Sequence, residues 1–326
     1  FPFTLTAEVT YTKKINDVML TNYNIKDNIS EWDRLQGADN RLVYPKDYKY
    51  YSKINDACVL TNTHKGYGYT FNLTATAEPI KDLNVMAAYT HTVMKEISGM
   101  PGSNASSAWS GLYTVNGPNF ATLQNSQYVI PDRLIASVSY KYGKDHFSLF
   151  YTGYSPSGYS FFYNGDLNGD GIKNDLMYIP KDDSEINFSS DDDRKAFWAF
   201  VNQDKYLKNH KGEYAGAYSA RAPFVHRFDF RWAHDFDVKI GNTSNRLQLS
   251  LDIMNVGNLF NSKWGVEKNM ASCNNGQVLK VVKVENNTPV YSMMKVNGEY
   301  PTETWSFNHN YDQCWKMQIG VKYYFN

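Results

Sequence analysis

The sequence predicts an all-β, antiparallel fold whose strands cross a membrane as a portion of a transmembrane β-barrel. Three observations predict it: apolar and polar residues alternate along many segments, several segments run for about ten residues or more, and short turns alternate with long connections. Alternation with a period of two gives a strand one apolar and one polar face. About ten residues are enough to cross a hydrocarbon layer at a tilt.

The alternation is clearest in residues 226–240. Even positions there carry Phe228, Phe230 and Trp232, whereas almost every charge falls on an odd position, as at Arg227 and Asp229. The same pattern predicts nine strands, at residues 3–13, 18–26, 56–78, 83–95, 132–142, 146–154, 226–240, 246–256 and 312–325. The third is long enough for two strands. A break near Gly66 would place two short turns in succession, so we expect one unbroken strand.

The connections between these strands differ sharply in length. Short turns are expected at residues 14–17, 79–82, 143–145 and 241–245, and long loops at 27–55, 97–131, 155–224 and 257–311. A meander with this alternation has all its short turns at one rim and all its long loops at the other, as in barrels with periplasmic turns and external loops. Strands of a soluble antiparallel sandwich also have one solvent-facing side, but that fold does not require short turns at one end and long loops at the other.

Nine strands would place the two termini on opposite sides of the membrane. Single-chain bacterial barrels normally have an even number of strands, and unpaired strand edges cannot face lipid. We therefore expect further strands to precede Phe1.

Composition excludes several other classes of protein. Lys and Arg number 33, as do Asp and Glu, and this balance provides no field that would attract nucleic acid. Mean hydropathy is −0.55, and no apolar run approaches the roughly 18 residues of a transmembrane helix. Aromatic residues make up 16% and gather near predicted strand ends, as at Tyr11, Tyr140 and Tyr323, which is typical of an interfacial girdle. The three cysteines, Cys58, Cys273 and Cys314, allow one disulfide at most.

Two segments carry a resemblance to a known family. Residues 252–261, ending in Asn258-Leu259-Phe260-Asn261, resemble a segment near the end of TonB-dependent outer-membrane transporters. The final strand, residues 317–325, is similar to their closing strand, although Asn326 follows its aromatic residue. Within the family, residues 153–156, 166–180, 206–212 and 221–224 are similar to the Oar-like branch of Bacteroidota.

The resemblance implies that residues 1–326 are the C-terminal part of a TonB-dependent receptor barrel, about nine of 22 strands, whose plug domain lies outside this chain. It implies uptake of a large or scarce nutrient, a siderophore, glycan or peptide, across the cell outer membrane. The implied partners are a TonB-type energy-coupling protein acting through the plug, outer-membrane lipid, the barrel-assembly machinery and a surface lipoprotein. The alternatives are a barrel-anchored surface binding protein or adhesin without transport, and a soluble β-sandwich.

One loop carries the oxygen-ligand spacing of a calcium site. Its candidate ligands are Asp166, Asn168, Asp170, the Ile172 carbonyl, Asn174 and Asp175, with Gly171 at the sharp turn. The twelfth position is Met177 rather than a bidentate Glu. The alternative is an Asx-rich turn, because Asp, Asn and Gly are also common turn residues.

The remaining loop features concern ligand contacts. Residues 190–212 predict a short external helix, begun by Ser190 or Asp191 and ended by Gly212, that stiffens or covers the barrel mouth. Candidate ligand-stacking residues are Trp109, Tyr113, Trp264 and Trp305, with packing between loops as the alternative. No GxSxG or HExxH motif occurs, so the sequence predicts no enzyme.

Overall fold

The computed structural model describes residues 2–156, 158–241 and 243–325. Eight long strands form one antiparallel sheet in the order β1-β4-β5-β7-β8-β14-β15-β20, and the short β6 pairs with β5. The strands are β1 (Phe3–Lys13), β4 (Tyr67–Ile80), β5 (Leu83–Glu96), β6 (Gln124–Asn125), β7 (Asp132–Tyr142), β8 (Asp145–Tyr154), β14 (Val225–Ile240), β15 (Thr243–Met254) and β20 (Lys316–Tyr324). The predicted all-β, antiparallel fold is confirmed.

The strand register separates apolar and polar side chains into opposite faces of this sheet. One continuous row of paired residues crosses all eight strands and is apolar throughout: Phe3, Ala77, Val85, Val138, Leu149, Phe230, Ile253 and Met317. An adjacent row on the other face is polar: Asn84, Ser139, Ser148, Arg231, Asp252 and Gln318. The alternation along each strand therefore becomes two chemically distinct surfaces.

No second layer covers the apolar face in the described residues. Phe3 is 59% exposed, Leu149 42% and Ile319 70%, and Phe230 and Leu249 are half-buried. None of these five belongs to a buried hydrophobic cluster. The interdigitated core of a two-sheet sandwich is thus absent from the part of the chain that the structure describes.

Two predicted strands differ from the structure at the N-terminal edge. The segment 56–78 is split into β3 (Cys58–Thr63) and β4, and β2 (Asp17–Asn22) pairs with β3 rather than joining the main sheet. The amide of Lys14 donates to the Gly66 carbonyl (3.0 Å) at the break. The chain continues from β1 into β2 across residues 14–17, which therefore do not form a reversing turn. The segment paired with it is interrupted at the same position, between β3 and β4. The prediction of an unbroken third strand is wrong.

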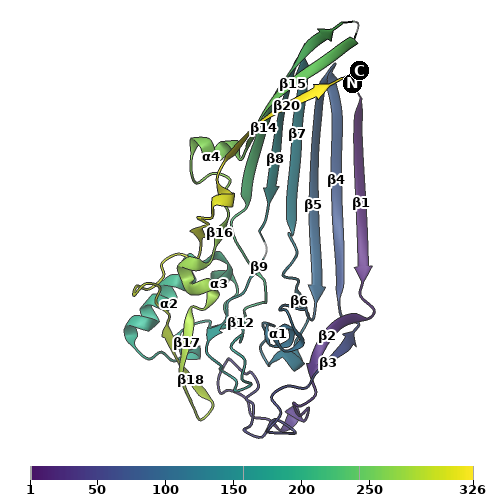
Figure 1. Cartoon of the computed structure of the whole chain (residues 1–326). Helices are drawn as coiled ribbons and strands as arrows, with labels where there is room; N and C mark the ends of the chain where they lie inside the picture. The colour runs from purple at the N-terminus through teal and green to yellow at the C-terminus, as the bar shows by residue number, and fades with distance from the viewer. Residues whose placement is uncertain (1, 157, 242, 326) are drawn as a thin grey trace.

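This correction changes the count and the positions of the termini. With eight strands across the sheet, β1 begins and β20 ends at the same end of the molecule (Figure 1). The short connections at residues 81–82 and 143–144 lie at that end, as do the last residues of β14 and the first residues of β15, and the long connections lie at the other end, hereafter the loop end. The expectation of termini on opposite sides is therefore wrong, whereas the segregation of short and long connections is observed.

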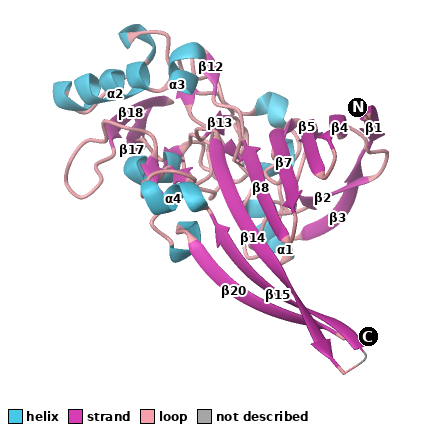
Figure 2. Ribbon diagram, turned by 90° about the horizontal axis from the view of Figure 1, so that it is seen from above, coloured by secondary structure: helices cyan, strands magenta, loops and turns pink. Residues whose placement is uncertain are grey.

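The hydrophobic core lies in the loop end instead of against the sheet. Its largest cluster includes Phe161, Met177 and Ile179 together with Phe197 and Phe200. The loop-end helices are α1 (Ala105–Ser110), α2 (Asp191–Gln203), α3 (Lys205–Asn209) and α4 (Val256–Phe260), and its strands are β9 (Gly158–Tyr159), β10 (Tyr163–Asn164), β11 (Tyr178–Ile179), β12 (Glu213–Tyr214), β13 (Ala220–Arg221), β16 (Lys268–Asn269), β17 (Leu279–Glu285), β18 (Thr288–Met293) and β19 (Ser306–Phe307). The helices α2 and α3 lie at the loop end (Figure 1), and seen from above they project to one side of the curved sheet (Figure 2).

The helix predicted at residues 190–212 is present as two helices, α2 and α3. Ser190 caps α2 by accepting a hydrogen bond from the amide of Asp193 (3.1 Å). Asp204 adopts an extended conformation, which ends α2, and its side chain caps α3. Among the described residues, no helix has the length and apolar character needed to span a membrane. Cys58, Cys273 and Cys314 are free thiols.

Candidate functional site

A buried polar centre around Arg41 holds two of the long loops together. The guanidinium is fully buried; its Nε donates to Asp39 (2.9 Å) and its Nη2 donates to the Leu176 carbonyl (2.6 Å). It also lies over the rings of Tyr163 and Tyr214, at 5.1 and 5.5 Å. Breaking a buried ion pair on one side is costly because the remaining charge lacks compensation. Arg41 therefore acts as a structural link between residues 14–66 and 155–224.

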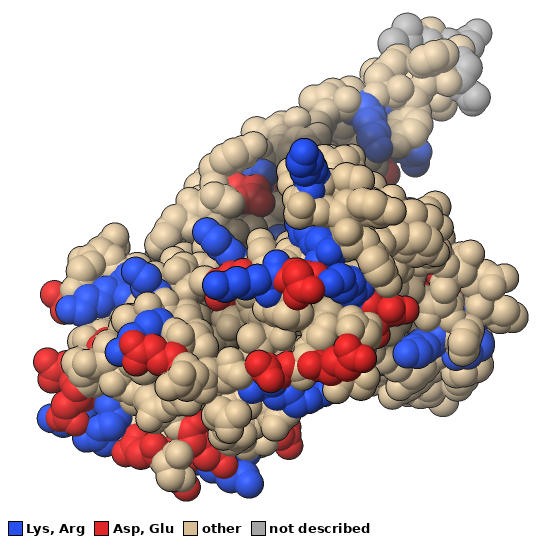
Figure 3. Space-filling model, turned by 90° about the horizontal axis from the view of Figure 1, so that it is seen from below, with Lys and Arg blue, Asp and Glu red and all other residues tan. Residues whose placement is uncertain are grey.

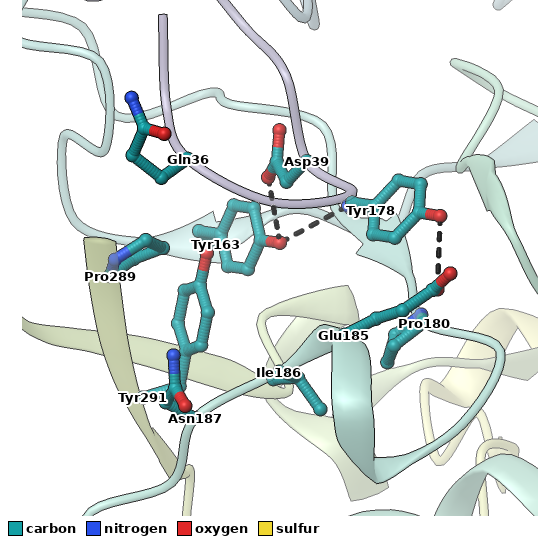
Figure 4. Close-up of a pocket in the computed structure, with 10 residues that line it drawn as sticks. All are labelled: Gln36, Asp39, Tyr163, Tyr178, Pro180, Glu185, Ile186, Asn187, Pro289 and Tyr291. Atoms are coloured by element: carbon teal, nitrogen blue, oxygen red, sulfur yellow. Dashed lines mark hydrogen bonds between the residues drawn. The ribbon is translucent and has the colours of Figure 1, made fainter. Parts of the chain in front are cut away.

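A small cavity adjoins this centre (Figure 4). The Tyr163 hydroxyl donates to Asp39 (3.4 Å) and accepts from the amide of Tyr178 (3.2 Å), while the Tyr178 hydroxyl donates to Glu185 (3.1 Å). Tyr291 stacks on Tyr163, with ring centroids 5.0 Å apart. The cavity volume is about 20 Å³, which suits a single water molecule and no larger ligand.

The loop predicted to bind calcium folds into nested Asx turns. The Asp166 carboxylate accepts hydrogen bonds from the amides of Gly169 (2.7 Å) and Gly171 (2.8 Å). Asn168 accepts from the amide of Asp170 (3.0 Å), and Asp170 accepts from the amide of Ile172 (2.7 Å). Side-chain oxygens that accept local backbone amides in this way are typical of Asx-rich turns.

The other candidate ligands of that loop are engaged elsewhere. Asp175 accepts from the amide of Leu167 (2.8 Å) and lies 3.5 Å from Nη1 of Arg41, so its nearby cation is a guanidinium. The Asn174 amide donates to the Ser110 carbonyl (3.0 Å). Across the described ranges, no group of three or more His, Cys, Asp or Glu side chains could hold a metal ion. These hydrogen bonds match the Asx-turn interpretation, and the calcium site stays a prediction.

Burial changes the acidity of two carboxyl groups in this loop. Loss of solvation, with the nearby charge of Asp175, raises the pKa of Asp170 to about 8. Loss of solvation also raises the pKa of Asp175 to about 7, although the charge of Arg41 opposes this change. Both groups sit in the core of the loop end, so their protonation is coupled to its folding.

The four predicted ligand-stacking residues fall into two pairs. Trp109 is 3% exposed and its indole N–H donates to Asn119 (2.9 Å). Tyr113 packs against Phe162 and Tyr218, with ring centroids 4.8 and 5.5 Å away. These two side chains pack the loops together, as the alternative interpretation proposed. Trp264 and Trp305 instead line two separate clefts.

Trp264 lines a cleft at the junction of the apolar sheet face and the loop end, which we call the Trp264 cleft. Its volume is about 490 Å³, and one wall is formed by Phe224, His226 and Phe228. The other wall includes Lys268, whose ammonium lies 4.5 Å from the ring centroid of Phe307. His226 and Phe228 occupy the apolar face of β14, so this cleft continues that face.

Trp305 lines the second cleft, between α3 and the segment that leads into β14, which we call the α3 cleft. Its volume is about 500 Å³. The lining residues are Lys205, Tyr206, Asn209, His210, Ser219, Arg221, Ala222, Pro223 and Trp305. They come from two long loops, residues 155–224 and 255–315. The sequence marked only Trp305 as a candidate contact, because no local pattern links it to Arg221.

Hydrogen bonds and close packing fix the walls of the α3 cleft. Asp204 accepts from the amide of Leu207 (2.8 Å), which begins α3, and from the hydroxyl of Thr304 (2.6 Å), which precedes Trp305. The Trp305 ring also meets Tyr159 edge-on, with centroids 5.4 Å apart. The two loops are thus tied directly beside the cleft, which favours a preformed site.

A glycine permits the close strand pairing behind this wall. Gly158 of β9 pairs with Arg221 of β13, and a Cβ atom at Gly158 would collide with the carbonyl oxygen of Tyr218. Glycine is therefore required for the approach that positions Arg221 at the cleft.

Comparison with protein-family models, curated proteins and solved structures found no match.

Proposed function

We propose that this chain forms part of the wall of an outer-membrane β-barrel and carries external, ligand-binding loops of a TonB-dependent transporter or receptor. The observation that carries the proposal is the uncovered apolar row that runs across the sheet from Phe3 to Met317. Each Å² of apolar surface left in water forfeits about 25 cal/mol of stabilisation, and a contiguous apolar surface marks an interface. Lipid tails would cover this face without a second protein layer.

The stagger of the sheet supports the same proposal. The apolar row meets β1 at its first residue, Phe3, at the short-turn end. It meets β14 at Phe230, in the half of that strand nearer the loop end, and β14 continues from there to Ile240. The row therefore crosses the strands obliquely. Strands must tilt and stagger in this way for a sheet to curve into a barrel wall, and the sheet is visibly curved (Figure 2).

Side chains at the two ends of the apolar face suit the boundaries of a bilayer. At the short-turn end, Tyr140 stacks with Tyr142 and Tyr323 stacks with Phe325, at 6.4 and 6.2 Å between centroids. At the loop end, the Trp264 cleft combines aromatic rings with lysines. Aromatic rings and long cationic side chains both favour the headgroup level.

The transport part of the proposal rests on the resemblance of residues 252–261 and 317–325 to TonB-dependent transporters. In this proposal, the loop end faces outward, ligand binds there, and a TonB-type partner acts through the plug of the complete protein. A barrel-anchored binding protein would share the wall and loops. Uptake in cells separates the two, because loss of the TonB-type partner abolishes accumulation of a transported ligand but leaves surface binding unchanged.

The membrane assignment is tested with the complete barrel to which this chain is proposed to belong, because β1 and β20 are unpaired edges of the sheet. The barrel is mixed with lipid vesicles or diluted into buffer without detergent. We expect protease to cleave only the long loops after insertion, while the strands stay protected by lipid. In buffer alone, the uncovered apolar face should cause aggregation. A monomeric, cooperatively folded sample in buffer would refute the proposal.

A further inference from the structure

The α3 cleft differs in charge from the rest of the loop end. Viewed from below, acidic and basic side chains are interspersed over that end of the molecule (Figure 3). The ionisable lining of the cleft, in contrast, consists of Lys205, His210, Arg221 and Tyr206, and none of the described residues that line it carries a carboxylate. A concave surface with cations of one sign and few compensating acids favours an anionic ligand.

Arg221 is the main observation. Its Nη1 is buried and has no hydrogen-bond partner, and among the described residues its guanidinium forms no ion pair within 4.0 Å. Burial lowers the pKa of Arg221, and the charge of Asp132 opposes this change. Asp132, however, already accepts a hydrogen bond from the Tyr89 hydroxyl (2.6 Å) and lies 2.9 Å from Nδ1 of His91.

Arg41, whose role is structural, provides a comparison for Arg221. Its Nη1 also lacks a hydrogen bond, but it lies 3.5 Å from Asp175, while Nε and Nη2 donate to Asp39 and to the Leu176 carbonyl and two aromatic rings surround the group. Arg221 is half-buried, and its buried Nη1 has neither a hydrogen bond nor a carboxylate within 4.0 Å among the described residues, so this atom loses hydration without compensation. The two arginines therefore differ in their ion pairs: Arg41 has Asp39 and Asp175 within 4.0 Å, whereas the charge of Arg221 has no such partner in the described chain and is available to an anionic group from outside.

Other hydrogen-bond donors in the cleft also lack partners in the described chain. Within the described chain, no hydrogen-bond partner is found for the Lys205 ammonium, the Asn209 amide or the Trp305 indole N–H. His210 has its Nδ1 2.8 Å from the Tyr206 carbonyl and stacks on the Tyr206 ring at 4.2 Å, which fixes its orientation. The cleft therefore offers several donors and a flat indole surface in one cavity.

We propose that the α3 cleft binds a carboxylate-bearing ligand, with Arg221 and Lys205 pairing with the carboxylate and Trp305 packing against the body of the ligand. A planar guanidinium matches a carboxylate through two parallel hydrogen bonds. The volume of about 500 Å³ lies within the range of small-molecule sites. This inference names the ligand class of the external loops, and it rests on the proposed function for the statement that the ligand is destined for uptake.

The inference is tested by isothermal titration of the full chain in detergent with trigalacturonate. Its methyl ester has the same sugar rings without the charges, and triglutamate carries carboxylates on a peptide, so the pair distinguishes the two sources of the group. We expect binding of at least one acidic probe, at least about tenfold weaker binding of the neutral ester, and weakening by salt. Equal binding of acid and ester, or binding of neither acidic probe, would overturn the inference.

Variants locate the site. Arg221→Gln should weaken binding of the acidic probe about tenfold or more, since it removes a charge-assisted pair, and Arg221→Lys should give an intermediate affinity because it keeps the charge but loses the fork. Lys263→Gln, in the Trp264 cleft, is the matched control and should leave the affinity unchanged. If Arg221→Gln binds as tightly as the native chain while its melting temperature is preserved, the cleft is not the site.

The proposed function and this inference fail separately. A complete barrel that inserts into vesicles, together with a chain that does not distinguish acid from ester, refutes the ligand class alone. A chain that binds the acid in an Arg221-dependent manner but folds as a monomer in buffer refutes the membrane assignment alone.

Discussion

The loop end buries its apolar side chains against one another, whereas the sheet leaves the side chains of its apolar face uncovered. In the loop end Phe197, Val201 and Leu207 are completely buried against other side chains. In the sheet the equally apolar Leu149 and Ile319 are 42% and 70% exposed, because no layer of the described chain covers them. The loop end thus has the packing of a globular protein in water, whereas the sheet keeps an apolar face that no described residue covers, which is why we propose that lipid covers it.

The largest effect that we expect is a pH dependence of the free energy of unfolding that belongs to the loop end and not to the sheet. The pKa of Asp170 is about 8 and that of Asp175 about 7, both above the ordinary 3.8. The folded loop end therefore binds more protons than the unfolded chain between about pH 4 and pH 8, so its free energy of unfolding falls as the pH rises through this window. Hydrogen-exchange protection of the Leu167 and Ile172 amides, corrected for intrinsic rates, should decrease from pH 5 to pH 8.5.

The control for this pH effect is Asp170→Asn, which keeps an acceptor for the Ile172 amide but removes one titrating group. It should flatten the pH dependence. Protection that rises with pH in the native chain would contradict the assignment of buried, protonated carboxyls.

A cavity in the packed core should produce the next largest effect. Phe197→Ala removes a completely buried ring that contacts Phe188 and Trp198, and we expect it to lower the free energy of unfolding of the loop end by about 3–5 kcal/mol. Phe147→Ala, at a 40% exposed position of the sheet, is the comparison and should cost clearly less. Denaturant unfolding followed by loop-end tryptophan fluorescence measures both, and equal costs would remove the distinction between the two regions.

A charge on the apolar sheet face tests what covers that face. Leu149→Arg places a cation in the apolar row of β8, and Ser148→Arg places the same side chain on the polar face of the same strand. In lipid vesicles we expect Leu149→Arg to cost about 2–4 kcal/mol if it lies near the bilayer midplane, and Ser148→Arg to cost much less. Reversible unfolding from vesicles supplies the values. Similar costs at the two positions would show that lipid does not cover the apolar face.

A smaller effect is expected from the helix cap that joins the two loops at the α3 cleft. Asp204→Ala removes the acceptor for the Leu207 amide and for the Thr304 hydroxyl. Loss of an N-cap costs about 0.5–2 kcal/mol, and we expect a value near the upper limit because both bonds are lost. Asp191→Ala, on the exposed first turn of α2, is the matched control. A cost for Asp204→Ala no greater than that of the control would indicate that the two loops are held together elsewhere.

The smallest effect concerns calcium. Because Asp175 faces Arg41 and the turn carboxylates accept backbone amides, we expect millimolar calcium to leave the melting temperature unchanged. Calcium uptake measured before and after Asp170→Ala should be equal. A stabilisation by calcium that this substitution removes would restore the metal-site hypothesis.

The sequence predicted the strands well where one physical rule dominates. In residues 132–142 and 226–240 the alternation of side chains decides which face each residue occupies, and β7 and β14 lie within one residue of the predicted bounds. The rule is local, because successive side chains of an extended chain point to opposite faces whatever lies nearby.

The N-terminal ribbon required the tertiary structure. Lys14 and Gly66 are distant in sequence but meet where both strands break, so neither break alone could be distinguished from a turn. The aromatic residues behave similarly. Trp109 and Trp305 have the same chemistry, yet the first is buried and bonded to Asn119 while the second lines a cleft.

The sequence by itself determined the all-β class, the two faces of each strand and the alternation of short and long connections, since each follows from the period and spacing of residues along the chain. Only the tertiary structure decided that eight strands cross the sheet, that Asp175 faces a guanidinium, and that Arg221 reaches the α3 cleft without a partner. These features depend on contacts between residues far apart in the chain, which no local pattern encodes.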